Sequence, residues 1–266
     1  MLESLLDLKE ISNKPYLMLF WALIITSVSI LVSIQISYQV VISDVAFNLS
    51  GIFSVLFVVM ASVYFITVVI RKEERMEEEE IARHHRKSFW PRHQADIMML
   101  MFFFTGITLA FALWSFFLPP ETFHVQVAKI NDIHGISGAF LDPAAAFIAI
   151  LLNNTQVMVF SFMFSFVFGA GAVFILVWNA SVLGVYIGQI SQSVWHIPVV
   201  SLSFLPHGVP EIAGYVCAGL AGGLLSVAIL RQHKKGVLKI VSIDSLKVLL
   251  LGVFLILLGA GIEAYL

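Results

Sequence analysis

The segment "SLSFLPHGVPEIAGYVCAGLAGGLL", residues 201–225, places one glutamate near the start of a long apolar run that is rich in small residues. That glutamate, Glu211, is the only formal charge between Pro143 and Leu230. An apolar run of this length predicts a helix that crosses a lipid bilayer. An ionisable side chain at such a position is costly, and it is therefore a candidate for function. The segment predicts both a membrane fold and a site.

The composition of the whole chain agrees with a membrane fold. The 266 residues have a mean hydropathy of +0.96, and 59% of them are hydrophobic while 12% are charged. Such a chain cannot form one soluble core and still keep a polar surface. We therefore expect an all-α, polytopic transmembrane helix bundle. Its single cysteine, Cys217, excludes an internal disulfide and a thiolate metal cluster.

Apolar runs of about 20 residues are long enough to cross the hydrocarbon core. We predict about seven crossings, at residues 17–40, 51–70, 97–118, 156–177, 182–205, 206–230 and 246–266. Residues 143–152 are only half as long as a crossing and predict a re-entrant or interfacial helix. Segment 182–205 contains the polar sequence "QISQS" and predicts a discontinuous crossing, which either spans fully or is re-entrant.

Three regions are expected along the chain. Residues 1–70 predict an N-terminal helical hairpin, and 97–266 predict the main transmembrane domain. Between them, residues 71–96 form a charged arm whose acidic and basic side chains recur three and four apart, which is typical of a solvated helix. The segments 71–96 and 231–247 carry seven and five Lys or Arg residues, so both are expected in the cytoplasm of a multi-pass cell-membrane protein.

Two interpretations of Glu211 remain open. It can be an acid in the first turn of a helix, where the helix dipole favours negative charge. Alternatively, His207 and Glu211 lie four residues apart, on a face that continues through Gly214, Ala218 and Gly222. Small residues let helices approach closely, so this face points into the bundle, where an ionisable pair indicates function. We then expect His207 and Glu211 to contact each other and the asparagine-bearing segments, in a polar cluster near the outer membrane boundary.

A series of motifs resembles the stage II sporulation protein M family. In chain order they are the asparagine pair Asn153 and Asn154, the "FGAG" segment with Gly169 and Gly171, a polar turn at Asn179, "PHGVPE" with His207, Gly208 and Glu211, and the small residues of "AGLAGG". The resemblance covers about residues 97–266, which leaves 1–96 outside it. Ala180 stands where the family commonly has glycine, and the "PHGVPE" spacer contains an extra proline.

The resemblance implies an integral membrane protein without an established enzymatic activity. The sporulation members of that family act with cell-wall hydrolases, as membrane anchors or organisers of a complex. We accordingly expect that the protein has no enzymatic activity and binds no cofactor and no metal. The expected partners are the lipid bilayer and either further copies of the chain or other subunits of a membrane complex, and no nucleic-acid-binding module is expected.

Three classes of function remain. A scaffold or assembly factor fits the small residues that permit close helix packing, namely Gly184, Gly188, Gly214, Ala218, Gly219, Gly222 and Gly223. A transporter, channel or permease subunit fits the broken segments and a polar pocket around His207 and Glu211, which Asn153, Asn154, Asn179, Gln189 and Gln192 could line. An intramembrane hydrolase fits least, because the chain has no His-Glu-x-x-His helix.

Overall fold

The predicted helical bundle is confirmed. The computed structural model describes residues 14–36, 39–42, 45–82, 89–137, 142–169, 171–230 and 235–265. Its helices are α2 Leu17–Gln35, α3 Ser50–Ala82, α4 Phe89–Phe117, η2 Pro120–Phe123, α5 His124–Ser137, α6 Pro143–Phe168, α7 Ala172–Ile190, α8 His196–Ser203, α9 Leu205–Leu230 and α10 Lys235–Tyr265. A short antiparallel ribbon of β1 (Gln39–Ile42) and β2 (Val45–Asn48), in which Gln39 pairs with Asn48, joins α2 to α3.

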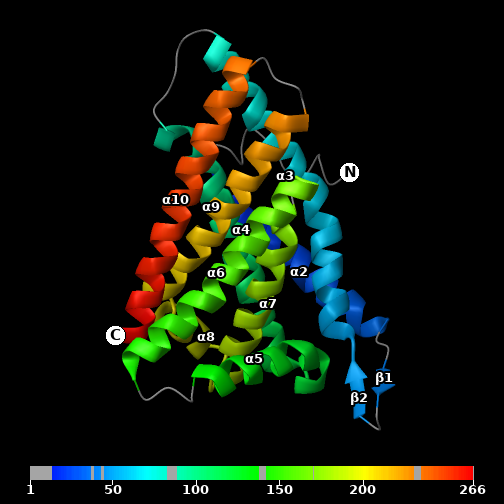
Figure 1. Ribbon diagram of the computed structural model, residues 1–266. Helices are drawn as coiled ribbons and strands as arrows, with labels where there is room; N and C mark the ends of the chain where they lie inside the picture. Colours follow the sequence, from blue (N-terminus) through cyan, green and yellow to red (C-terminus); the bar gives the residue numbers. More distant parts are fainter. Residues whose placement is uncertain are drawn as a thin grey trace.

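Long helices run the length of the bundle in alternating directions (Figure 1). Within the described residues, six of them are long and apolar enough to cross a membrane, namely α2, α4, α6, α7, α9 and α10. Helix α3 is also long, and its first half holds a shorter apolar stretch, Ser50–Tyr64. The short helices α5 and α8 and the strands lie together at one end, where α9 begins and α10 ends.

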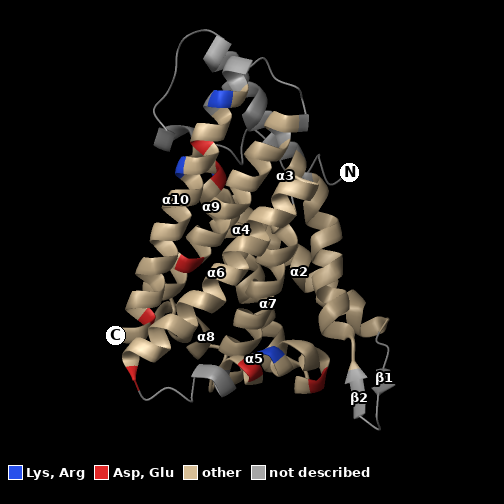
Figure 2. Ribbon diagram, viewed as in Figure 1, with Lys and Arg blue, Asp and Glu red and all other residues tan. Residues whose placement is uncertain are grey.

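One hydrophobic core joins the N-terminal hairpin to the rest of the chain. Met18 and Ala22 of α2 and Val58 of α3 are buried in the same cluster as Phe103 of α4 and Leu176 of α7. Charged residues of the described part lie mainly at the two ends of the bundle, and few lie along its length (Figure 2). The hairpin therefore packs as part of the membrane bundle.

The expected break at the asparagine pair is wrong. Helix α6 continues through Asn153 and Asn154, so residues 143–152 are the first part of a full-length helix. The helix starts as its sequence favours, because Asp142 accepts a hydrogen bond from the backbone N–H of Ala144 (3.3 Å) and Pro143 follows it. It ends at Gly169, whose φ of 71° is favoured only for glycine.

Because α6 runs further than expected, the next crossing also begins and ends at other residues than predicted. Helix α7 spans Ala172–Ile190, so Asn179 lies in the middle of a helix and does not form the expected turn. The polar "QISQS" segment marks the end of α7, and α8 follows it as a short helix of eight residues. The crossings expected at 156–177 and 182–205 are therefore replaced by α6 and α7. The two helices still run in opposite directions, as the two expected crossings would (Figure 1).

Candidate functional site

A hydrogen-bonded cluster joins α6 to α9 inside the bundle. The Asn154 Nδ2 group donates to Glu211 Oε1 at 2.6 Å, and the Tyr215 hydroxyl donates to Asn154 Oδ1 at 2.6 Å. Asn154 and Tyr215 are 5% and 6% exposed, so water would not compete for these bonds. Asn153 adds a longer bond of 3.4 Å from its Nδ2 to Asn154 Oδ1.

The chemistry of the three groups explains the orientation of the Asn154 amide. The bonded oxygen of the Glu211 carboxyl accepts a hydrogen bond, so it faces the NH₂ end of the amide, and the amide oxygen is then left for the Tyr215 hydroxyl. Glu211 and Tyr215 are four residues apart, so both reach α6 from one face of α9. The single Asn154 side chain thereby holds two turns of α9 against α6.

A second carboxyl group adjoins this cluster. Glu263 of α10 interacts with the side chain of Glu211. Gly259, one turn earlier, makes room for this approach, because a Cβ atom there would lie 2.5 Å from Glu211 Cγ and 3.0 Å from the His207 carbonyl oxygen. The cluster therefore gathers groups from three helices, α6, α9 and α10.

Small residues continue this contact along α9 and α10. A Cβ atom on Gly214 would lie 2.6 Å from Ile256 and 3.0 Å from the carbonyl oxygen of Gly252. Gly252 in turn faces Cys217 and Ala218 of α9. Glu211, Gly214 and Ala218 of the predicted face therefore pack against α10, whereas Gly222, expected on the same face, abuts the backbone of α6.

Glu211 does not occupy the first turn of its helix. Helix α9 begins at Leu205, and its first turn contains no acidic residue. At a rise of 1.5 Å per residue, Glu211 lies about 9 Å along the helix axis from Leu205. Because its contacts are side chains of α6 and α10, stabilisation by the helix terminus does not explain its position.

His207 takes a different environment from Glu211. Its ring packs edge-on against Phe204, with 5.8 Å between ring centroids. Among the described residues no hydrogen bond joins the His207 side chain to Glu211 or to an asparagine. The neighbouring Gly208 has open space beside it. The structure thus brings Glu211 to Asn154 and Asn153, and it places the His207 ring on an aromatic neighbour.

The other polar residues of the expected pocket do not reach the cluster. Asn179 donates to the carbonyl oxygen of Ile175 in its own helix (2.8 Å). Gln189 and Gln192 are exposed at the far end of α7 and in the loop that follows it. Of the expected lining, only Asn153, Asn154 and Glu211 are joined by hydrogen bonds in the described structure.

The predicted packing glycines all face other segments of the same chain. Gly184 and Gly188 abut α4, where a Cβ atom on Gly184 would lie 2.5 Å from the Thr108 carbonyl oxygen. Gly219 faces Ala172 of α7, while Gly222 faces the backbone of α6 at Phe162. Gly223 faces the Gly169 carbonyl oxygen, and Gly171 faces the backbone of Phe164. These small residues therefore serve packing within one chain.

Sequence reasoning missed two members of the cluster, Tyr215 and Glu263. Tyr215 lies four residues after Glu211, so the spacing that singled out His207 also indicates Tyr215. Glu263 is the only formal charge in residues 248–266, which is the same signal that singled out Glu211. Over the residues that the structure describes, no three His, Cys, Asp or Glu side chains gather as a metal site.

Comparison with known proteins places the chain in a family. The family model of stage II sporulation protein M matches residues 53–266, which includes the charged arm that we expected to lie outside the resemblance. An uncharacterized protein of Methanocaldococcus jannaschii is 29% identical over 144 residues, which are 53% of this chain and 80% of that protein. No solved structure matches the chain. The chain is an integral membrane protein of the stage II sporulation protein M family.

Proposed function

We propose that the protein is a non-enzymatic membrane scaffold, a subunit that holds a partner protein against α6 within the bilayer. One observation carries the proposal. Asn153 and Gln156 are exposed on α6, and within the described structure Gln156 makes no side-chain hydrogen bond. Gln156 lies about 20 Å along a helix of about 39 Å at 1.5 Å per residue, close to mid-membrane.

The lipid core offers no hydrogen-bond partner to the Gln156 amide, and none to Asn153 beyond its long bond to Asn154. A polar group in hydrocarbon without a hydrogen-bond partner costs several kcal/mol, roughly 4–8 kcal/mol for transfer of an amide or hydroxyl to an alkane. Side chains that donate and accept across helices are the usual way to satisfy such groups in membranes. A protein surface that covers α6 would therefore be favoured over lipid.

The buried cluster supports this role by fixing how α6 is turned. Its bonds to Glu211 and Tyr215 hold Asn154 inward. Asn153 and Gln156 stand one residue before and two residues after Asn154, so both are directed away from that inner face. A scaffold needs such a rigid presentation, because ordering a surface on binding costs affinity.

A transporter subunit is the second candidate, and the neighbouring carboxyl groups of Glu211 and Glu263 favour it. Paired ionisable residues inside a membrane often mark ion or proton pathways. This candidate does not need a partner protein on α6. The two functions therefore differ in what the outer amides do.

Removing the outer amides tests the scaffold. We expect the double substitution Asn153→Leu and Gln156→Leu to lose the protein that co-purifies with the wild type in mild detergent, because the polar contacts are gone. Thr105→Leu is the matched control, since Thr105 is exposed on α4 but bonds the Met101 carbonyl oxygen of its own helix. If the variant with both Asn153→Leu and Gln156→Leu still co-purifies with as much partner protein as the wild type, the scaffold proposal is wrong.

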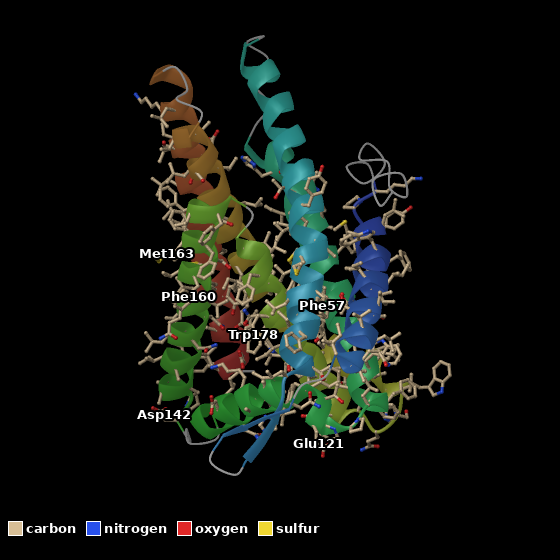
Figure 3. All side chains as sticks on the ribbon, turned by 90° about the vertical axis from the view of Figure 1, so that its right-hand side faces the viewer. Phe57, Glu121, Asp142, Phe160, Met163 and Trp178 are labelled. Carbon is tan, nitrogen blue, oxygen red and sulfur yellow. The ribbon has the colours of Figure 1, made fainter. Side chains whose placement is uncertain are left out.

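We also propose that the segments 71–96 and 231–247 face the cytoplasm of a cell-membrane protein. Their excess of Lys and Arg supports this orientation. So does their place in the fold, because the end of α3 and the start of α10 lie at the same end of the bundle (Figure 1). Asp142 and Glu121 both lie at the opposite end, on different sides of the bundle (Figure 3).

Thiol labelling of intact cells checks this orientation. In a Cys217→Ala chain, Glu121→Cys should react with a membrane-impermeant reagent, because Glu121 is exposed at the outer end. Lys239→Cys should react only after the cells are permeabilised, although the Lys239 side chain is also exposed. Labelling of position 239 from outside in sealed cells would reverse the proposed orientation.

A further inference from the structure

The outer face of α6 carries a regular row of exposed side chains. Its members, which we name the outer seam, are Asn153, Gln156, Phe160, Met163 and Val167. They recur at spacings of three, four, three and four residues, the heptad spacing of helices that pack side by side. Phe160, Met163 and Val167 are 52%, 53% and 61% exposed, and Figure 3 shows the first two at the outer edge of the bundle.

Helix α6 is also the least covered of the membrane spans. Only 17% of its apolar span is buried, whereas 61% of the spans of α4 and α9 is buried. Its inner side chains, Asn154, Met158, Ser161 and Ser165, already contact the bundle on the other side. The outer seam is thus a complete second packing face without an occupant in one chain.

We propose that the occupant is a second copy of this chain, packed α6 against α6 about a two-fold axis along the membrane normal. This inference rests on the proposed function, since it names the partner. Two copies inserted in the same orientation meet with equivalent residues at equal depth. Each amide of the outer seam then faces an amide of the second copy.

Amide chemistry makes this meeting favourable. Asn and Gln side chains both donate and accept hydrogen bonds, so an amide can bond to the same amide in the second copy. Two carboxylates or two ammonium groups cannot pair in this way. The outer seam contains no charged residue, so like charges do not oppose the pairing. A polar residue within a heptad row also sets the register of the two helices.

Other exposed faces lack this argument. Helix α2 exposes Phe20, Ile24, Val28 and Leu31, at 59%, 61%, 49% and 45%. Those side chains are all apolar, and lipid tails cover them as well as another helix would. Val28 therefore gives a control position near the middle of a lipid-facing helix.

Disulfide cross-linking in native membranes tests the proposal. In a Cys217→Ala chain, Gln156→Cys should form covalent dimers on mild oxidation, because residues beside a two-fold axis bring their Cβ atoms within the roughly 3.5–4.5 Å that a disulfide needs. Val28→Cys should stay monomeric. Equal cross-linking at both positions would indicate random collision and would overturn the dimer.

Counting how many copies of the chain each lipid-embedded particle contains distinguishes a dimer from a complex with a different protein and from a single chain. The wild type should contain two copies, and Asn153→Leu with Gln156→Leu should weaken the dimer roughly tenfold or more through the lost interhelical bonds. That variant keeps Cys217, so its protection from thiol reagents shows whether the bundle is still folded. One copy bound to a different protein at α6 overturns the dimer and leaves the scaffold standing. One copy without any partner overturns both.

Discussion

Replacement of Gly222 by leucine should push α9 away from α6 and destabilise the bundle. A Cβ atom at this position would collide with the Phe162 carbonyl oxygen and lie 3.0 Å from the Phe166 backbone nitrogen, both in α6. Backbone atoms cannot rotate away as a side-chain end can, so α6 and α9 must separate. Overpacking of this kind costs about 1–3 kcal/mol or more, and separation would also strain the Asn154–Glu211 bond.

Gly208 provides the matched control on the same helix. A Cβ atom on Gly208 would meet no atom of another helix within 4 Å, so Gly208→Leu should leave the fold intact. The single buried thiol of Cys217 reports unfolding directly, since a thiol-reactive dye reaches it only when α9 is released. We expect Gly222→Leu to lower the midpoint of dye reaction on heating by at least about 5 °C. Equal midpoints for the two variants would show that α6 and α9 do not pack as closely as described.

The membrane architecture is readable from the sequence because apolar length is a strong signal. Segments such as 97–118 and 206–230 fall on α4 and α9, since a helix must satisfy its own backbone in lipid. Two adjacent asparagines predict the end of an apolar helix, so the sequence misplaces the break between α6 and α7. Asn154 finds its partners inside the bundle, and Gly169 supplies the left-handed conformation that ends the helix.

The candidate site was only partly predictable for a related reason. Spacing along α9 indicates which residues share a face, and the scarcity of polar groups indicates that Glu211 should meet an asparagine. Whether Glu263 faces Glu211, and whether the amides of α6 face outward, depends on how α10 and α6 are rotated about their own axes. The rotation of α10 is set by packing at Gly252 and Gly259, and that of α6 by the bonds of Asn154 to α9. The local pattern of one helix reveals neither rotation.

Loss of the Asn154 side chain should have the largest effect among changes to the polar cluster. Asn154→Leu leaves the Glu211 carboxyl and the Tyr215 hydroxyl without the partner that serves both. Each buried polar group left unsatisfied costs about 1–3 kcal/mol, and more where it is charged. We expect the midpoint of Cys217 dye reaction to fall by about 5–10 °C.

Two further variants show whether the hydrogen bonds cause this loss. Glu211→Gln keeps an acceptor oxygen for the Asn154 Nδ2 group, so its midpoint should stay near that of the wild type. Tyr215→Phe removes only one donor and should cost about 0.5–1.5 kcal/mol. Because Asn154→Leu already destroys the bond to Tyr215, combining the two changes should add less than their sum, with a coupling of about 0.5–3 kcal/mol. Strictly additive effects would mean that Asn154 and Tyr215 stabilise the bundle independently, and the cluster would then not act as one clamp between α6 and α9.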